Sequence, residues 1–236
     1  MMRKRIRSFV IVIMVLTGGV MLLPLQSNKQ PLADEKIHAE GESMKLPEPK
    51  FSSQISLEEA FLNRRSVRAF REDSLTLEEI GQLLWAAQGV TEKWGGRTAP
   101  SAGALYPLEI YLLAGEIKDL EPGLYHYHPA DHSISQRIAK DLRGEVTEAS
   151  LNQDQILKAP ATLIITAIYE RTTKKYGERG IRYVHMEVGS VAENIYLQAE
   201  SLKLGTVFIG AFDDEEVKEA LGIAEEPLAI MPVGKK

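Results

Sequence analysis

Two short apolar runs and one long amphipathic segment constrain the fold of this chain most strongly. The run LEIYLLA at Leu108–Ala114 and the run ATLIITAIY at residues 161–169 predict buried strands. Residues 180–202 predict a long helix, because apolar residues recur there at helical spacing. These apolar positions are Val184, Val188, Val191, Ile195, Leu197, Ala199 and Leu202. The body of the chain therefore combines strands with at least one long helix.

Further elements are indicated by capping and turn signals. Capping boxes begin at Ser56 and Thr76, and the second opens a helix closed by Gly89. The remaining expected elements are strands at 123–128 and 133–138 around a turn at 129–131, a strand at 206–209, a helix at 213–221 and a strand at 228–233. Helices and strands alternate without a regular βαβ rhythm, which favours an α+β fold. The glycine fingerprints of dinucleotide-binding and P-loop folds are absent from the sequence.

The N-terminal part of the chain has the features of a targeting segment. A basic stretch precedes an uncharged apolar run at residues 9–25, which is near the lower length limit for a membrane span. We therefore expect residues 1–25 to be a signal anchor or a signal peptide, 26–53 an extended linker, and 54–236 the folded domain. The basic flank predicts a membrane-anchored protein with an extracytoplasmic domain, or a secreted one if the leader is cleaved.

Charge and composition exclude several function classes. Five cations and no acid lie in residues 1–29, so the rest of the chain carries a net charge of −10, against −5 for the whole. An acidic body argues against nucleic acid as a partner. The absence of cysteine excludes disulfides, cysteine-ligated zinc, iron–sulfur centres and thiol catalysis, and we expect no metal site.

Three segments of the body have compositions suited to ligand binding. The segment RRSVRAF contains Arg64, Arg65, Ser66 and Arg68, and its guanidinium groups can bind phosphate oxygens unless they form only a solvated basic surface. The segment PSAGALYP contains Pro100, Ser101, Ala102 and Gly103, whose small side chains allow close approach of a flat ligand. The segment IGAFD contains Ile209, Gly210 and Ala211. Read singly, the last two are equally compatible with ordinary connections.

In this order, the three segments resemble those of the FMN-dependent nitroreductase superfamily over residues 56–236. The resemblance implies a nitroreductase-like fold with a central mixed or antiparallel sheet flanked by helices, in an intertwined homodimer. It implies that Arg64, Arg65, Ser66 and Arg68 hold FMN, and that Pro100, Ser101, Ala102 and Gly103 reach it from the other subunit. Ile209, Gly210 and Ala211 would approach the flavin ring by their backbone, and Lys235 would add charge near the phosphate.

A narrower resemblance concerns residues 171–194, RTTKKYGERGIRYVHMEVGSVAEN. This segment resembles SagB-type dehydrogenases, which oxidise thiazolines and oxazolines in modified peptides. The resemblance casts Lys175 and Tyr176 as the catalytic pair that removes a proton while a hydride goes to FMN. A lysine acts as a base only when burial or neighbouring cations favour its neutral form. Ser190 and Glu193 stand where the family pattern has histidine and glutamine.

Three functions follow from these observations. The first is a SagB-type dehydrogenase acting on a small molecule or a modified peptide. The second is an NAD(P)H-dependent nitro or quinone reductase of the same fold. The third is a non-catalytic flavin-binding subunit of a membrane complex. Bound flavin and its reduction by NAD(P)H distinguish among them.

Overall fold

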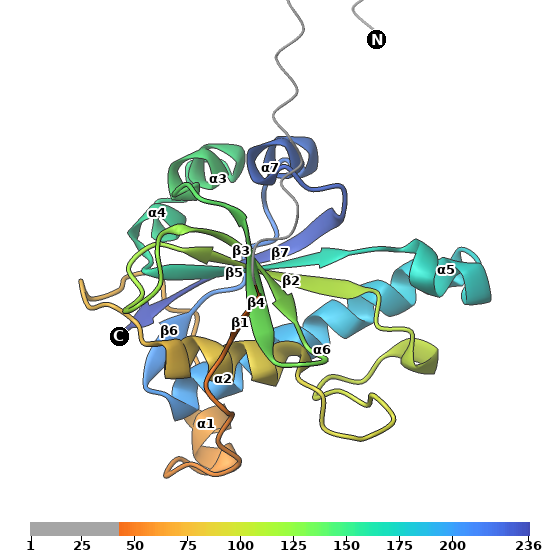
Figure 1. Ribbon diagram of the computed structural model, residues 1–236, viewed down its shortest axis with the longest axis horizontal. Coiled ribbons are helices and arrows are strands. Elements are labelled where there is room, and N and C mark those ends of the chain that lie inside the picture. The colour runs from red at the N-terminus through yellow and green to blue at the C-terminus, as the bar shows by residue number, and fades with distance from the viewer. Residues whose placement is uncertain (1–42) are drawn as a thin grey trace, which may run out of the picture. The chain divides into compact units, whose positions relative to one another are not determined.

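A seven-stranded antiparallel sheet forms the centre of the computed structural model, which describes residues 43–236 (Figure 1). The strand order is β1-β4-β3-β2-β5-β7-β6. The strands are β1 (Ser43–Lys45), β2 (Leu108–Ala114), β3 (Gly123–His128), β4 (Ser133–Ile138), β5 (Ala161–Ala167), β6 (Leu204–Thr206) and β7 (Glu226–Lys235). The helices are α1 (Leu57–Asn63), α2 (Leu77–Gln88), the 3-10 turn η1 (Ala102–Ala104), α3 (Arg143–Ala149), α4 (Gln155–Lys158), α5 (Glu170–Tyr176), α6 (Arg179–Ser201) and α7 (Asp214–Leu221). The predicted α+β class is confirmed.

The central strands are apolar throughout because helices cover both faces of the sheet. In β2, Ile110 and Leu112 enter the cluster that includes α2 and α6, whereas Tyr111 and Leu113 enter a second cluster with α3 and α7. The predicted buried strand at Leu108–Ala114 is confirmed. The strand predicted at residues 161–169 ends at Ala167, and α5 follows it.

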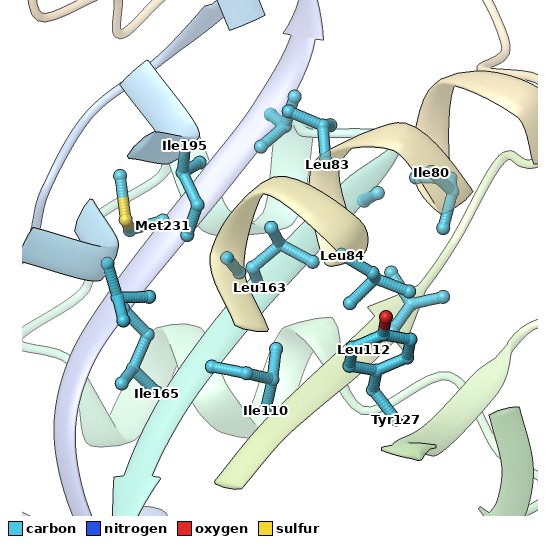
Figure 2. Packing of buried hydrophobic residues seen from close by; sticks show 14 of the residues in the cluster. Ile80, Leu83, Leu84, Ile110, Leu112, Tyr127, Leu163, Ile165, Ile195 and Met231 are labelled. Carbon is cyan, nitrogen blue, oxygen red and sulfur yellow. The ribbon is translucent and has the colours of Figure 1, made fainter. Parts of the chain in front are cut away.

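Helix α6 packs against the sheet and contacts several residues of the candidate site. Five of the seven apolar positions predicted from the spacing are buried, whereas Leu197 and Leu202 are partly exposed. Figure 2 shows Ile80, Leu83 and Leu84 of α2 and Ile195 of α6 packed over side chains of β2, β5 and β7. Helix α6 is therefore held along much of its length, and its side chains are fixed relative to the sheet.

The helix caps agree closely with the sequence signals. The Thr76 side chain accepts from the Glu79 amide, the Glu79 carboxylate accepts from the Thr76 amide, and Gly89 is the C-cap of α2. The Ser56 side chain accepts from the Glu59 amide at the start of α1, which is one of the two bonds of the predicted capping box. Helices α3, α4 and α5 had no counterpart in the predicted elements, since they are short and lack a side-chain N-cap.

Two predicted boundaries differ from the structure. The strand expected at residues 206–209 is displaced, since β6 ends at Thr206 and Ile209 forms only an isolated bridge with Ile230. Part of the predicted linker 26–53 packs on the sheet, because β1 pairs with β4 and Leu46 is buried. The other domain limits stay a prediction.

The predicted membrane-anchored, extracytoplasmic or secreted location is corrected. Among the helices in residues 43–236, none combines the length and the apolar character needed to cross a membrane. The longest, α6, has 23 residues and is amphipathic, with charges such as Arg182 and Glu193 along it. The apolar run at 9–25, on which the prediction depended, lies outside the described residues.

Candidate functional site

The first predicted segment leaves α1 and runs along the β6–β7 edge of the sheet. Ser66 forms a parallel bridge with Thr206, and the Val67 amide donates to the Thr206 carbonyl at 2.9 Å. Further along, the Arg71 amide donates to the Lys235 carbonyl at 2.9 Å. Backbone pairing therefore fixes this segment beside the C-terminal strand, although the residues are far apart in sequence.

Tyr196 of α6 joins the first and third segments. Its hydroxyl lies 3.2 Å from the Ser66 Oγ and accepts from the Phe208 amide at 2.8 Å. The Arg64 guanidinium carbon lies 5.1 Å from the centre of the Tyr196 ring, in cation–π range. Sequence reasoning missed Tyr196, because its position on the buried side of a long helix is equally typical of a core residue.

The cations of the first segment are not equivalent. Arg64 and Arg68 have no carboxylate within ion-pair distance among the described residues. By contrast, Arg65 donates to the Leu62 and Arg64 carbonyls at 3.1 and 2.7 Å. The Lys235 ammonium is bound to Glu79. Two guanidinium groups are therefore available to an anionic ligand at this edge.

The third segment follows β6 and presents its backbone at the surface. Ile209 exchanges two backbone hydrogen bonds with Ile230, while Gly210 and Ala211 are exposed. Gln153 donates to the Ala211 carbonyl at 2.8 Å, and Asp213 caps α7 through the Glu216 amide. The helix predicted at 213–221 is confirmed as α7, with Asp213 as its N-cap. Hydrogen bonds at Ile209 and at Asp213 therefore fix the segment on either side of the exposed Gly210 and Ala211.

The second predicted segment meets the predicted catalytic pair. Gly103 has φ +65°, and a Cβ built on it would lie 2.7 Å from the Tyr176 hydroxyl and 2.9 Å from the Lys175 Nζ. The two functional groups therefore converge on one backbone position that only glycine can occupy without displacing them. The sequence showed neither this contact nor that α5 would carry the pair.

Aromatic rings and cations surround the pair. The Tyr176 ring packs edge-on against Tyr183, with ring centres 5.2 Å apart. The Lys175 Nζ lies 5.3 Å from the Tyr176 ring centre, and the Arg179 guanidinium lies 5.6 Å from that of Tyr183. In the described part of the chain, no carboxylate forms an ion pair with Lys175 or Arg179. The surface here is cationic in an otherwise acidic body.

A partly buried polar cluster anchors α5 to the sheet. Glu109 of β2 forms an ion pair with Arg171 at 2.5 Å and a hydrogen bond with the His126 Nε2 at 2.8 Å. Burial raises the pKa of Glu109, but the bonds from His126 and Arg171 outweigh it and hold that pKa below its ordinary value. Arg171 also donates to the Tyr106 carbonyl at 3.0 Å. The start of α5 is thereby tied to the strand and to the loop that carries Gly103.

One chain does not bring all the predicted residues together. The Gly103 loop and α5 lie near the N-terminal end of α6, whereas Ser66 and β6 lie near its C-terminal end (Figure 1). From Glu187, beside Ser101, to Tyr196, beside Ser66, is roughly 13 Å along the helix axis.

The grooves on the surface of the described residues lie away from the predicted site residues. One of ≈ 810 Å³, lined by Lys50, Phe51, Trp85 and Gln198 among others, contains none of the predicted site residues.

Comparisons with known proteins identify the family of this chain. The family model described as the Nitroreductase family matches residues 62–235. A protein of Methanocaldococcus jannaschii named as a nitroreductase is 50% identical over 196 residues, covering 83% of this chain and 98% of its own length. The microcin B17-processing protein McbC of Escherichia coli is 26% identical over 77% of this chain and 71% of its own.

A solved structure supports the same assignment. A crystal structure from Ralstonia eutropha, titled as a nitroreductase, is 31% identical and has a TM-score of 0.72. The alignment covers 82% of this chain and 89% of that one. The family resemblance and the nitroreductase-like fold predicted from sequence are thus confirmed, and this chain belongs to the nitroreductase family.

Proposed function

We propose that this protein is an FMN-dependent dehydrogenase that oxidises a modified peptide, with Lys175 and Tyr176 as its catalytic pair. Membership of the nitroreductase family makes it an oxidoreductase, and proteins of this family bind flavin. The observation that carries the proposal is the convergence of the Lys175 Nζ and the Tyr176 hydroxyl on Gly103. The similarity to a microcin-processing protein supports a peptide substrate.

The residues at the β6–β7 edge fit an anionic cofactor. Arg64 and Arg68 offer guanidinium groups without carboxylate partners in the described structure, and Ser66 adds a hydroxyl. Ile209, Gly210 and Ala211 would meet the flavin ring by backbone, and Arg65 and Lys235 would add positive charge. Pro100, Ser101, Ala102 and Gly103 would come from a second copy, so we propose a homodimer.

The chemistry divides between cofactor and protein. When bound, FMN supplies the acceptor for a hydride at its N5 atom. The second hydrogen of the oxidised bond leaves as a proton, which a nearby base has to accept. Lys175 would accept it, and the Tyr176 hydroxyl would orient the reacting ring. Gly103 leaves the space in which both groups can reach one substrate atom.

The catalytic pair is tested with a peptide that carries one thiazoline. Lys175→Ala and Tyr176→Phe should keep wild-type FMN content but lower turnover about 10²-fold or more. Lys174→Ala is the matched control, since this neighbouring lysine is exposed and does not reach Gly103. Turnover of Lys175→Ala equal to that of Lys174→Ala would remove the catalytic role.

The flavin site is tested by absorbance and mass of the purified protein. Arg64→Ala and Arg68→Ala should lose FMN, whereas Arg71→Ala should retain it because Arg71 is paired with Asp73 at 2.7 Å. Full FMN occupancy in both variants would contradict this site. Sedimentation tests the homodimer: a monomer that binds FMN tightly would exclude the shared site.

A second candidate function is NAD(P)H-dependent reduction of nitro or quinone compounds. The 50% identity to a protein named as a nitroreductase favours it. Anaerobic mixing with NADPH separates the two candidates. Rapid loss of the flavin's visible absorbance would support the reductase, while loss only with the thiazoline peptide would support the dehydrogenase.

A further inference from the structure

Glu187 is a buried carboxyl group beneath the loop that carries Gly103. Its residue is 3% exposed, on the side of α6 that faces the loop. The Ser101 side chain lies near enough to lower its pKa, and the Gln88 Nε2 lies 3.5 Å from its Oε1. No cation lies within ion-pair distance of Glu187 among the described residues, and burial raises its pKa. A carboxyl group in such a position is costly to keep for stability alone.

The loop above Glu187 has a strained backbone. Gly103, Ala104 and Tyr106 all have left-handed φ values, of 65°, 53° and 45°. Alanine and tyrosine adopt this conformation only at a cost in free energy, so surrounding interactions have to impose it. Such strain is common where a backbone is shaped for a ligand or a reaction.

A closed ring of interactions imposes this conformation. The Ser101 Oγ accepts from the Tyr106 amide at 2.9 Å, so its own proton can turn toward the neighbouring Glu187 carboxyl group. The Tyr106 ring stacks under the Arg97 guanidinium at 4.4 Å, and the Arg97 Nη1 donates to the Gln88 Oε1 at 2.9 Å. The Gln88 Nε2 in turn lies 3.5 Å from the Glu187 Oε1, which closes the ring. Both ends of the strained stretch are thus tied to one buried carboxyl group.

We propose that Glu187 is a positioning residue, which holds the loop at residues 101–106 so that Gly103 stays against Lys175 and Tyr176. The inference rests on the proposed function, because it assigns the loop to the catalytic pair. A carboxyl group suits this task, since it accepts from Ser101 and Gln88 at once and cannot donate in its ionised form. An apolar residue of the same size would fill the space but would offer no acceptor for the proton of the Ser101 hydroxyl.

The test compares Glu187→Leu with Glu187→Gln and with Glu200→Leu. Leucine removes both acceptors, whereas glutamine keeps one for the Ser101 hydroxyl. Glu200 is the matched control, because it is also buried on α6 but is paired with Lys236 at 2.6 Å, far from the loop. Hydrogen exchange of the Tyr106 amide, which donates to Ser101, reports the loop directly.

In Glu187→Leu, the Tyr106 amide should exchange roughly tenfold faster, and kcat should fall about 10²-fold with KM unchanged. Glu187→Gln should restore most of both, and Glu200→Leu should change neither. Wild-type exchange in Glu187→Leu would overturn the inference. Faster exchange in a protein whose wild type never oxidises the thiazoline peptide would keep the positioning role and refute the proposed function instead.

Discussion

Replacing Gly103 by alanine tests whether the loop sets the position of the catalytic pair. The added Cβ would lie 2.7 Å from the Tyr176 hydroxyl and 2.9 Å from the Lys175 Nζ. Ordinary contact begins at 3.4 Å, so the two groups would have to retreat by about 0.7 and 0.5 Å. Both are the ends of flexible side chains, and they can move without unfolding the domain. The change should therefore affect catalysis much more than stability.

The cost in stability comes from the backbone. An alanine with left-handed φ costs about 1–2 kcal/mol, and the lower entropy of the unfolded chain offsets about 0.4–1 kcal/mol of it. We expect Gly103→Ala to lower the free energy of unfolding by about 1 kcal/mol, or Tm by about 3 °C. A misplacement approaching 1 Å should lower turnover about 10- to 100-fold.

Gly222→Ala is the matched control. Gly222 has φ +60°, close to that of Gly103, but its nearest neighbour, the Ile138 Cδ1, would lie 3.7 Å from the new Cβ. It should lose about as much stability by the same backbone argument, with wild-type turnover. Denaturant unfolding and turnover of the thiazoline peptide are measured on both variants at equal FMN content. Full turnover in Gly103→Ala, or equal losses in the two variants, would refute the reasoning.

Two further changes test the electrostatics of the fold. The pKa of Glu109 is lowered in the folded protein, so its stabilising contribution is present at neutral pH and is lost as pH falls below about 4.3 toward the folded value. Glu109→Gln should therefore weaken the dependence of the unfolding free energy on pH in the acid range. An unchanged pH dependence would contradict this assignment. Arg143, 8% exposed, donates to Glu116 at 2.6 Å, Asp141 at 2.7 Å and the Ala159 carbonyl at 3.0 Å. Arg143→Met should cost about 1–3 kcal/mol in denaturant unfolding, and a variant as stable as wild type would show that the two half-exposed carboxylates contribute nothing.

Local signals in the sequence were sufficient for the main elements and for the family. The apolar runs of β2 and β5 predict strands because both faces of the sheet are covered, and the Thr76 capping box fixes the start of α2 through contacts within four residues. Short helices without caps, such as α5, carry no comparable local signal. The location predicted from the N-terminal apolar run was wrong. None of the helices in residues 43–236 could cross a membrane, and the run itself lies outside the described residues.

The sequence alone determined which residue types gather in which segments: guanidinium groups in one, small residues in another, and a Lys-Tyr pair in a third. Only the tertiary structure decided which of them meet. Tyr196 links Ser66 to Phe208, and Gly103 lies against Lys175 and Tyr176, across separations of tens of residues or more. Such contacts depend on how α6 crosses the sheet, because packing of the whole core sets that crossing and no local pattern encodes it.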